Sequence, residues 1–282
     1  MKIQFICLAS GSSGNCYYLG TETYGILIDA GIPAKKIKQC LEDNGIGFER
    51  VIAVFVTHDH ADHIKSLGTL GERCNIPIYA TRETHFGINR NYCTTRKLVS
   101  CMRYVEKDIP LNFRDFTITP FEVPHDATDT VGYCIEIFGR TFCFVTDLGH
   151  ITESASQYID KANYLIIEAN YDEEMLANGP YPPYLKERIA GPNGHLCNAE
   201  TANYLAEHLS PRTSHVWLCH LSQENNHPEL AYKTVEYTLR NVGIVAGKDF
   251  YLAALKRTTP SELFEFEASP HFSEIIKKEM TS

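Results

Sequence analysis

Short apolar runs alternate with amphipathic stretches along most of the chain. Runs such as KIQFICL, RVIAVFVT and RTFCFVT are rich in β-branched and aromatic residues and are bounded by turn-forming residues, which predicts buried strands. Residues 33–45 and 227–243 instead show the helical spacing of apolar residues, each with a proline near its start and a glycine at its end. A third helix is predicted over residues 198–211, with Asn198 as its N-cap. This alternation of strands and helices is typical of an α/β protein.

The remaining pattern predicts a single domain. A helix is expected near residues 64–74, and two strands that meet at Gly139 predict a hairpin. The sequence contains no linker or internal repeat, so we interpret residues 1–282 as one domain with two halves rich in strand–helix units. In its C-terminal tail, about residues 256–282, no pattern assigns an element.

The composition is that of an ordinary globular protein with an acidic balance. The chain has 282 residues, 44% hydrophobic and 22% charged, and a formal net charge of −9. This balance argues against a general polyanion-binding protein but leaves room for a local basic patch. No run of about 18 apolar residues is present, and the N-terminus is too short and mixed for a signal peptide, so we expect no membrane contact. Most of the ten cysteines lie inside apolar runs, and none forms a C-x-x-C pair, which favours reduced thiols and a cytoplasmic location.

The densest group of titratable residues follows one of the predicted strands. THDHADH places His58, His60, Asp62 and His63 in the pattern H-x-H-x-D-H, directly after RVIAVFV. Side chains two residues apart in an extended turn point the same way, so His58 and His60 can bind one ion. The adjacent Asp62 and His63 can then face a second ion. Imidazole and carboxylate ligands suit zinc, and also manganese or iron.

Three further candidate ligands stand where a predicted strand gives way to a polar loop. They are His125 after FTITPFEVP, Asp147 after RTFCFVT and His220 after HVWLC. A single histidine in such a position is usually an ordinary loop residue. Beside the THDHADH cluster, however, these three complete a two-metal site, with Asp147 as the carboxylate that bridges the ions.

The order of these motifs resembles the metallo-β-lactamase fold superfamily over almost the whole chain. The resemblance implies a four-layer αβ/βα sandwich with a dinuclear site at one edge. In that site one metal would be bound by His58, His60 and His125, and the other by Asp62, His63 and His220, with Asp147 between them. True β-lactamases have a cysteine at the bridging position, so we do not expect antibiotic hydrolysis.

Two divalent cations also define the class of reaction. Ions roughly 3.5–4 Å apart lower the pKa of a shared water and polarise the substrate oxygen, so the activated water attacks an ester-type centre. The expected reaction is therefore hydrolysis. The cluster alone does not distinguish a carbon centre from a phosphorus centre.

Motifs further along the chain favour phosphorus. IEAN carries Glu168 at the end of a predicted strand, and GHLCN carries His195 before a predicted helix. Together with HLS, which begins at His220, these blocks resemble the tRNase Z-type members of the superfamily. That resemblance implies that His195 is a general acid for the leaving oxygen and that Glu168 orients it. Asp62 or Asp59 would move the proton of the attacking water.

A closer resemblance is to the YycJ/VicX/WalJ family. Its motifs are present as LASGSSGN, THDHADHI, PHDATDTVGY, IEANYDEEML, GPYP, GHLCN and HLSQENN. The resemblance implies a bacterial cytoplasmic nuclease with DNA exonuclease activity, and DNA rather than RNA as its partner. Cys197 departs from the pattern, because a serine is more usual there. The two metal ions would be zinc or manganese, and iron also fits the ligands. The oligomeric state, a dimer included, stays open.

Two loops contain candidate substrate-binding residues, which are Ser12, Ser13 and Asn15 in the first and Ser222, Asn225 and Asn226 in the second. Backbone N–H groups of the first loop, SGSSGN, can bind a phosphate. The loop has no Walker lysine, and the simpler interpretation is a tight turn between two strands. The second loop lies just past His220 and can orient either the substrate or His220 itself.

One segment departs from the acidic balance of the chain. Residues 82–107 contain six basic and two acidic residues, a local charge of +4, with aromatic residues interleaved. Basic side chains follow backbone phosphates and aromatic side chains stack on bases, so this segment can bind a nucleic acid. A solvated, variable loop explains the same composition equally well.

A metal-dependent phosphodiester hydrolase, and within that class a DNA exonuclease, is the function that these observations favour. The alternative is a carbon-centre hydrolase of glyoxalase II or lactonase type, which shares the metal ligands but does not need Glu168 and His195. A third hypothesis is a non-catalytic protein on a retained fold. Missing ligands would indicate it, and the motif contains all of them.

Overall fold

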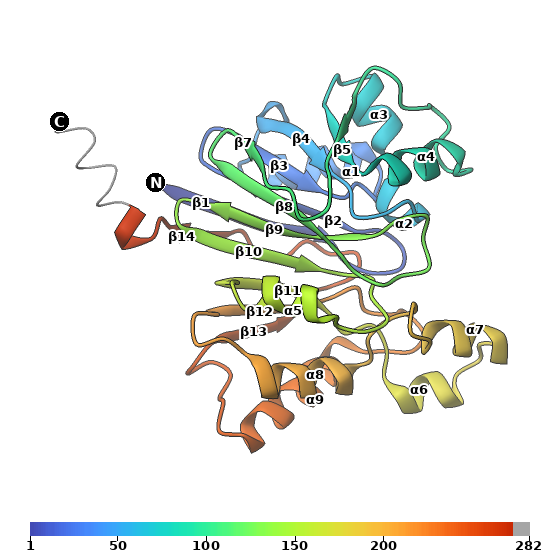
Figure 1. The fold of residues 1–282 in the computed structure, drawn as a ribbon, viewed down its shortest axis with the longest axis vertical. Coiled ribbons are helices and arrows are strands. Elements are labelled where there is room, and N and C mark those ends of the chain that lie inside the picture. The colour runs from blue at the N-terminus through green and yellow to red at the C-terminus, as the bar shows by residue number, and fades with distance from the viewer. Residues whose placement is uncertain (273–282) are drawn as a thin grey trace.

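Two mixed sheets lie face to face in the computed structural model, which describes residues 1–272 (Figure 1). The first sheet has the strand order β14 (Phe264–Glu267), β1 (Lys2–Ala9), β2 (Cys16–Gly20), β3 (Gly25–Ile28), β4 (Val51–Phe55), β5 (Ile78–Ala80) and β6 (Met102–Tyr104). The second has the order β13 (Tyr251–Ala254), β12 (His215–Cys219), β11 (Tyr164–Glu168), β10 (Arg140–Val145), β9 (Val131–Ile137), β8 (Phe116–Glu122) and β7 (Leu111–Phe113).

Helices cover the outer faces of both sheets (Figure 1). On the side of the first sheet are α1 (Ala34–Asp43), the 3₁₀ turn η1 (Phe48–Arg50), α2 (Ala61–Ile64), α3 (Leu67–Glu72) and α4 (Arg82–Arg90). On the side of the second are α5 (Glu153–Ile159), α6 (Glu173–Asn178), α7 (Pro183–Ile189), α8 (Asn198–His208) and α9 (Pro228–Asn241). The predicted four-layer α/β sandwich is confirmed. Within residues 1–272, no helix has both the length and the apolar character that a bilayer crossing requires.

The strands are buried on both faces because each sheet lies between the other sheet and its own helices. In β1, Ile3 and Phe5 belong to the core between the sheets, whereas Ile6 and Leu8 belong to the core under the helices. Trp217 of β12 also lies between the sheets, with its ring centroid 4.7 Å from that of Phe5. This double burial explains why the strands read as near-continuous apolar runs in the sequence.

The predicted hairpin is confirmed. Phe138 and Gly139 connect β9 to β10, and both have positive φ, 49° and 70°. Positive φ at both central residues is the requirement of a two-residue type I′ turn, whose twist matches that of the strands it joins. Arg140 accordingly pairs with Ile137 across the turn.

The predicted N-cap of α8 is wrong by one residue. Cys197 is the cap: its Sγ accepts from the Glu200 N–H at 3.3 Å, and the Glu200 carboxylate accepts from the Cys197 N–H at 2.9 Å. This reciprocal pair is a capping box in which sulfur takes the place of the usual hydroxyl oxygen. Asn198 is instead buried, and its amide hydrogen-bonds that of Asn226.

Three other segments differ in detail from what the sequence indicates. The helix expected near residues 64–74 is the shorter α3, and Ser66 separates it from α2 with bonds from its N–H to the Ala30 carbonyl and from its hydroxyl to the Ile32 carbonyl, at 2.9 and 2.5 Å. Residues 82–107 contain α4 and β6 rather than only a variable loop. The tail contains β14, which pairs with β1, and its residues 273–282 lie outside the described part.

Candidate metal centre

Carboxyl ends of parallel strands meet at one edge of both sheets, and polar residues follow them there. β3 and β4 are parallel neighbours in the first sheet, and β10, β11 and β12 are parallel neighbours in the second. Asp29, Asp147 and His220 follow β3, β10 and β12 with positive φ values of 59°, 57° and 53°. Left-handed backbone is uncommon outside glycine and gathers at functional sites, where the surrounding structure maintains it.

The first group of candidate ligands is His58, His60 and His125, whose ring nitrogens lie within 4.8 Å of one another. The Thr57 hydroxyl donates to a carboxylate at 2.9 Å, so it accepts from Nδ1 of His58 at 3.0 Å. This bond leaves the lone pair of His58 on Nε2, which is buried and has no hydrogen-bond partner. Burial, followed by the charge of His63, lowers the pKa of His58 well below its ordinary value. A neutral ring with an unused buried lone pair is what a metal ion requires.

The second group is Asp62, His63 and His220, also within 4.8 Å of one another. Nε2 of His63 lies 3.6 Å, and Nε2 of His220 3.2 Å, from the same oxygen of Asp62. Burial opposes a charge on His63, but the carboxylates of Asp147 and Asp29 outweigh burial and raise its pKa well above the ordinary value. The negative charge that favours a proton here favours a divalent cation for the same electrostatic reason.

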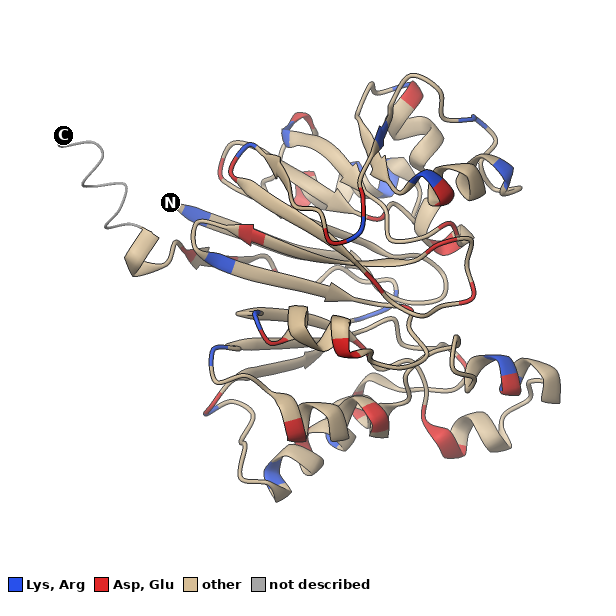
Figure 2. Cartoon of the chain, in the orientation of Figure 1, with Lys and Arg blue, Asp and Glu red and all other residues tan. Residues whose placement is uncertain are grey.

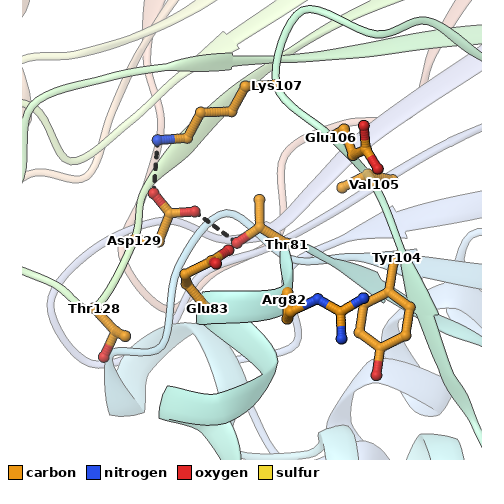
Figure 3. A pocket seen from close by; sticks show the side chains of 9 residues that line it. All are labelled: Thr81, Arg82, Glu83, Tyr104, Val105, Glu106, Lys107, Thr128 and Asp129. Carbon is orange, nitrogen blue, oxygen red and sulfur yellow. Dashed lines mark hydrogen bonds and ion pairs between the residues drawn. The ribbon is translucent and has the colours of Figure 1, made fainter.

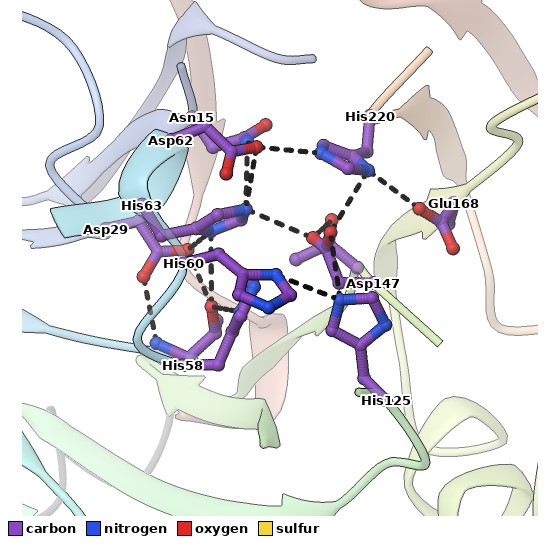
Figure 4. A network of polar contacts seen from close by, with 12 residues as sticks. Asn15, Asp29, His58, His60, Asp62, His63, His125, Asp147, Glu168 and His220 are labelled. Atoms are coloured by element: carbon purple, nitrogen blue, oxygen red, sulfur yellow. Dashed lines mark hydrogen bonds and ion pairs between the residues drawn. The ribbon is translucent and has the colours of Figure 1, made fainter. Parts of the chain in front are cut away.

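Asp147 lies between the two groups (Figure 4). One of its oxygens is 3.2 Å from Nε2 of His63, and the other is 3.2 Å from Nδ1 of His220 and 3.9 Å from Nε2 of His125. Burial alone would raise the pKa of Asp147, but the rings of His220 and His63 lower it well below the ordinary value. An ionised carboxylate in this position can contact an ion in either group.

Groups behind the rings fix which ring nitrogen faces the cluster. Nδ1 of His63 donates to Asp29 at 2.7 Å, and Nδ1 of His125 donates to the Gly194 carbonyl at 2.9 Å. His60 differs, because its Nδ1 lies 3.3 Å from Nε2 of His125. Such outer partners set the tautomer and orientation of a ligand histidine.

Glu168 contacts both a candidate ligand and the candidate general acid. Its Oε1 accepts from Nδ1 of His195 at 2.9 Å and from Nδ1 of His220 at 2.8 Å. Its Oε2 accepts from the backbone N–H groups of Leu148 and Leu196, both at 3.1 Å. Burial would raise the pKa of Glu168, but the charge of His195 and the hydrogen bonds from His195 and His220 lower it. His195 therefore has its Nδ1 committed and its Nε2 free for other contacts.

The candidate proton carriers next to the histidines differ in position. The Asp62 carboxylate lies inside the cluster and is 22% exposed. The Asp59 carboxylate instead accepts from the backbone N–H and the hydroxyl of Thr128, at 3.1 and 2.6 Å. Of the two carboxylates that the sequence offers, Asp62 is thus the one that reaches the site.

The first substrate-binding loop is divided between solvent and the cluster. Ser12 and Ser13 are exposed, whereas Asn15 is fully buried. The Asn15 amide lies 2.9 Å from Nε2 of His63 and 3.3 Å from Asp62. Asn15 therefore contacts candidate ligands, and only the two serines remain accessible to a phosphate.

The second loop is largely buried and supports the strand ends. The Asn226 amide donates to the carbonyls of Ala169 and Asn170, both at 2.9 Å. The Ser222 hydroxyl accepts from the Asn225 N–H at 3.2 Å, and Asn225 is itself fully buried. The structure thus gives Asn226 a supporting position under the site rather than an open one.

Two further residues of the site are absent from the sequence prediction. Asp29 accepts from His63, and the Asn170 amide donates to the His220 carbonyl at 2.8 Å and lies 3.2 Å from its Nδ1. Both were detectable in principle, because each is a polar residue at the end of an apolar strand, in GILID and in LIIEAN.

The arrangement as a whole fits divalent metal ions. Imidazole nitrogens and carboxylate oxygens converge from both sheets, the ring nitrogens are oriented from behind, and a buried nitrogen of His58 has no other partner. Nitrogen and oxygen donors of this kind bind zinc, manganese and iron in proteins.

The chain belongs to the β-lactamase superfamily, whose fold and type of metal ligands it shares. A family model described as Beta-lactamase superfamily domain matches residues 24–220, which include every candidate ligand. The same sandwich occurs in the crystal structure of the short form of human tRNase Z, which is 16% identical, covers 94% of this chain and 99% of that chain, and has a TM-score of 0.60. This likeness is one of fold.

Two relatives narrow the classification. Exodeoxyribonuclease YycJ of Bacillus anthracis is 33% identical over 266 residues, which are 93% of this chain and 99% of that protein. Exodeoxyribonuclease WalJ of Streptococcus pneumoniae is 33% identical over 262 residues, which are 93% of this chain and 97% of that protein. The chain therefore belongs to the YycJ/WalJ family, as its motifs predict.

Proposed function

We propose that this chain is a metal-dependent phosphodiester hydrolase that degrades DNA as an exonuclease. The observation that carries the proposal is the 2.9 Å hydrogen bond from His195 to Glu168 beside the cluster. It provides an oriented proton donor, which a leaving alkoxide on phosphorus needs. The names of both relatives support DNA as the substrate. A DNA substrate in a bacterial cell implies the cytoplasm as the location.

In this proposal two divalent ions, zinc or manganese, occupy the cluster, and iron is compatible with the same donors. One would be bound by His58, His60 and His125 and the other by Asp62, His63 and His220, with Asp147 shared between them. Such ions lower the pKa of a water and polarise phosphoryl oxygens when they are bound.

Side chains of the protein then accept and donate the protons of the reaction. Asp62 is the partly exposed carboxylate of the cluster, so it accepts the proton of the attacking water. His195 donates from Nε2 to the leaving oxygen, because its Nδ1–H is held by Glu168. The Glu168 carboxylate, which itself accepts from two backbone N–H groups, keeps the ring in the orientation that this transfer requires.

One substrate panel tests the proposal. The purified chain, loaded with zinc or manganese, is given end-labelled single- and double-stranded DNA, RNA, a thioester and a lactone. We expect stepwise release of nucleotides from DNA that a chelator stops and added metal restores. Hydrolysis of the thioester or the lactone without cleavage of DNA would instead identify a carbon-centre hydrolase.

A further inference from the structure

We infer that the exposed face of α4 is the surface that holds single-stranded DNA beside the metal centre. The face consists of Arg82, Phe86 and Arg90, which we call the α4 stripe. The inference rests on the proposed function, because it names the part of the chain that binds the proposed substrate. Of the two interpretations of residues 82–107, nucleic-acid binding and a solvated loop, it corresponds to the first.

The α4 stripe is a continuous line along the helix. Its members are four residues apart, so they lie one above the other on the same side. At 1.5 Å per residue the stripe is about 12 Å long. The opposite side of α4, with His85 and Ile88, is buried. The helix thus has one side for the core and one side, with Phe86 59% exposed, for a partner.

Each arginine of the stripe lies over an aromatic ring. The Arg90 guanidinium is 5.1 Å from the centroid of Phe86, and that of Arg82 is 4.9 Å from the centroid of Tyr104, as Figure 3 shows for the second pair. Tyr92, just beyond α4, is 87% exposed. Exposed rings beside fixed cations combine the two contacts that unpaired nucleotides offer, which are base stacking and phosphate charge.

Exposed basic residues outnumber exposed acidic residues on this surface. The charge of Asp129 is balanced by Lys107, from which it accepts at 2.6 Å, and its carboxylate also accepts from the Thr81 hydroxyl at 2.6 Å (Figure 3). Two exposed glutamates remain, and the exposed basic residues are Arg82, Arg90, Arg96, Lys97 and Arg103. Figure 2 shows these basic positions as blue bands on α4 and on the segment that follows it. In a chain of net charge −9, this is a local surface for a polyanion.

A groove joins the stripe to the metal motif. It has a volume of about 340 Å³ and is lined by Asp59, Phe86, Gly87, Arg90, Asn91 and Thr128. Asp59 stands between the two ligands of HDH, and its carbonyl accepts from the Asn91 amide at 2.8 Å.

Close packing keeps α4 against the motif. A Cβ on Gly87 would lie 1.9 Å from the Asp59 carboxylate and 2.6 Å from the Thr128 hydroxyl, so the glycine lets the helix approach this closely without moving these side chains. A DNA strand that binds along α4 is therefore held at a fixed position relative to His58 and His60.

The test compares two double variants. F86A/R90A removes the ring and the charge from α4, and Y237A/R240A removes the same residue types from the exposed side of α9, in the outer layer behind the second sheet (Figure 1). The metal-loaded proteins bind a fluorescent single-stranded oligonucleotide with phosphorothioate linkages, which resists cleavage, over a range of salt concentrations. Circular dichroism and metal content verify that each variant is folded and loaded.

We expect F86A/R90A to weaken binding of single-stranded DNA by about tenfold or more in Kd, since it removes one ring that stacks on a base and one cation that contacts a phosphate. The slope of log Kd against log salt should fall by about 0.7 for one lost phosphate contact. A duplex of equal length should lose less affinity, because its bases are already stacked. Y237A/R240A should bind like the wild type.

The outcomes separate the two proposals. If the wild type binds and cleaves DNA while F86A/R90A keeps the same Kd and salt slope, the inference about α4 is overturned and the nuclease function stands. If the wild type neither binds nor cleaves DNA, the proposed function fails and this inference fails with it. If an R82E variant also binds DNA as the wild type does, Arg82, the remaining residue of the stripe, does not contact the DNA either.

Discussion

Single side chains behind the metal cluster decide what its histidines can do. Glu168 is the clearest case, because one of its oxygens is shared by His195 and His220. The same carboxylate therefore supports a proton donor and a candidate metal ligand. Removing His195 and removing the charge of Glu168 should consequently have different effects.

His195→Ala should abolish most DNA cleavage while the metal content stays the same. General acid catalysis typically contributes about 10²- to 10⁴-fold to the rate, so kcat should fall by that order. Glu168→Gln should lower both kcat and metal content, because it also withdraws the partner of His220. Metal analysis and single-turnover rates measure the two effects. Loss of metal from His195→Ala would place that ring among the ligands.

A histidine outside the site should make stability depend on pH. Burial among aromatic rings, with Trp217 5.3 Å and Phe266 5.0 Å away, lowers the pKa of His215 to about 4. The unfolded chain binds this proton near pH 6.5 and the folded chain near 4, so stability falls as the pH drops through that window. His215→Phe should lose less stability than the wild type between pH 6.5 and 4 in urea unfolding. Parallel losses in the two proteins would contradict the low pKa.

At the scale of elements, the site depends on how closely two loops, one before β2 and one after β3, approach the short helix α2. Asn15 and Gly31 lie against α2: the Asn15 N–H donates to the Asp62 carbonyl at 2.7 Å, and the Ala30 N–H to the His63 carbonyl at 2.8 Å. A Cβ on Gly31 would lie 1.6 Å from the Asp62 carbonyl oxygen. The four-residue helix is thus positioned by backbone contacts that leave no space for a side chain.

Gly31→Ala should displace α2 and empty the second group of ligands. Overpacking lowers the free energy of unfolding by about 1–3 kcal/mol, and by more where the backbone must move. We therefore expect a lower unfolding midpoint together with a lower metal content. Gly191→Ala is a milder control, since its Cβ would lie 3.0 Å from the nearest atom. Full metal binding by Gly31→Ala would show that α2 tolerates the shift.

At the scale of the whole molecule, the candidate centre connects the two sheets. His58 and His63 come from the loop and helix after β4, whereas Asp147 and His220 follow strands of the second sheet. The sheets also share one core, in which Phe5 packs against Trp217. We propose on this basis that residues 1–282 form a single domain.

Bound metal should therefore stabilise the entire fold. A ligand at 100 times its Kd adds about 2.7 kcal/mol to the free energy of unfolding, so zinc or manganese should raise the melting temperature and a chelator should reverse the rise. Asp147→Ala should show neither effect, because the carboxylate between the two groups is gone. Two ions per chain in Asp147→Ala, or an unchanged melting temperature of the wild type with metal, would contradict this coupling.

The features that the sequence predicts well are local ones. Strand β4 and the histidines after it lie within a dozen residues, and the left-handed turn at Gly139 needs only its neighbours. The errors arise where distant segments intervene. Ser66 separates α2 from α3 because it bonds to Ala30 and Ile32, more than 30 residues away, and β14 forms because β1 offers it an edge.

The sequence by itself determined most of the strands, the family and the types of candidate ligand, because apolar runs and the polar residues at their ends are properties of short segments. Only the tertiary structure decided which groups meet. Asp62 and His220 are 158 residues apart in the sequence, yet their side chains lie 3.2 Å from each other. No spacing in the sequence shows that Asp29 accepts a hydrogen bond from His63. The role of α4 is of the same kind. A basic composition is readable in a sequence, but a line of exposed arginine and aromatic side chains beside the metal motif exists only once the helix is packed against Asp59.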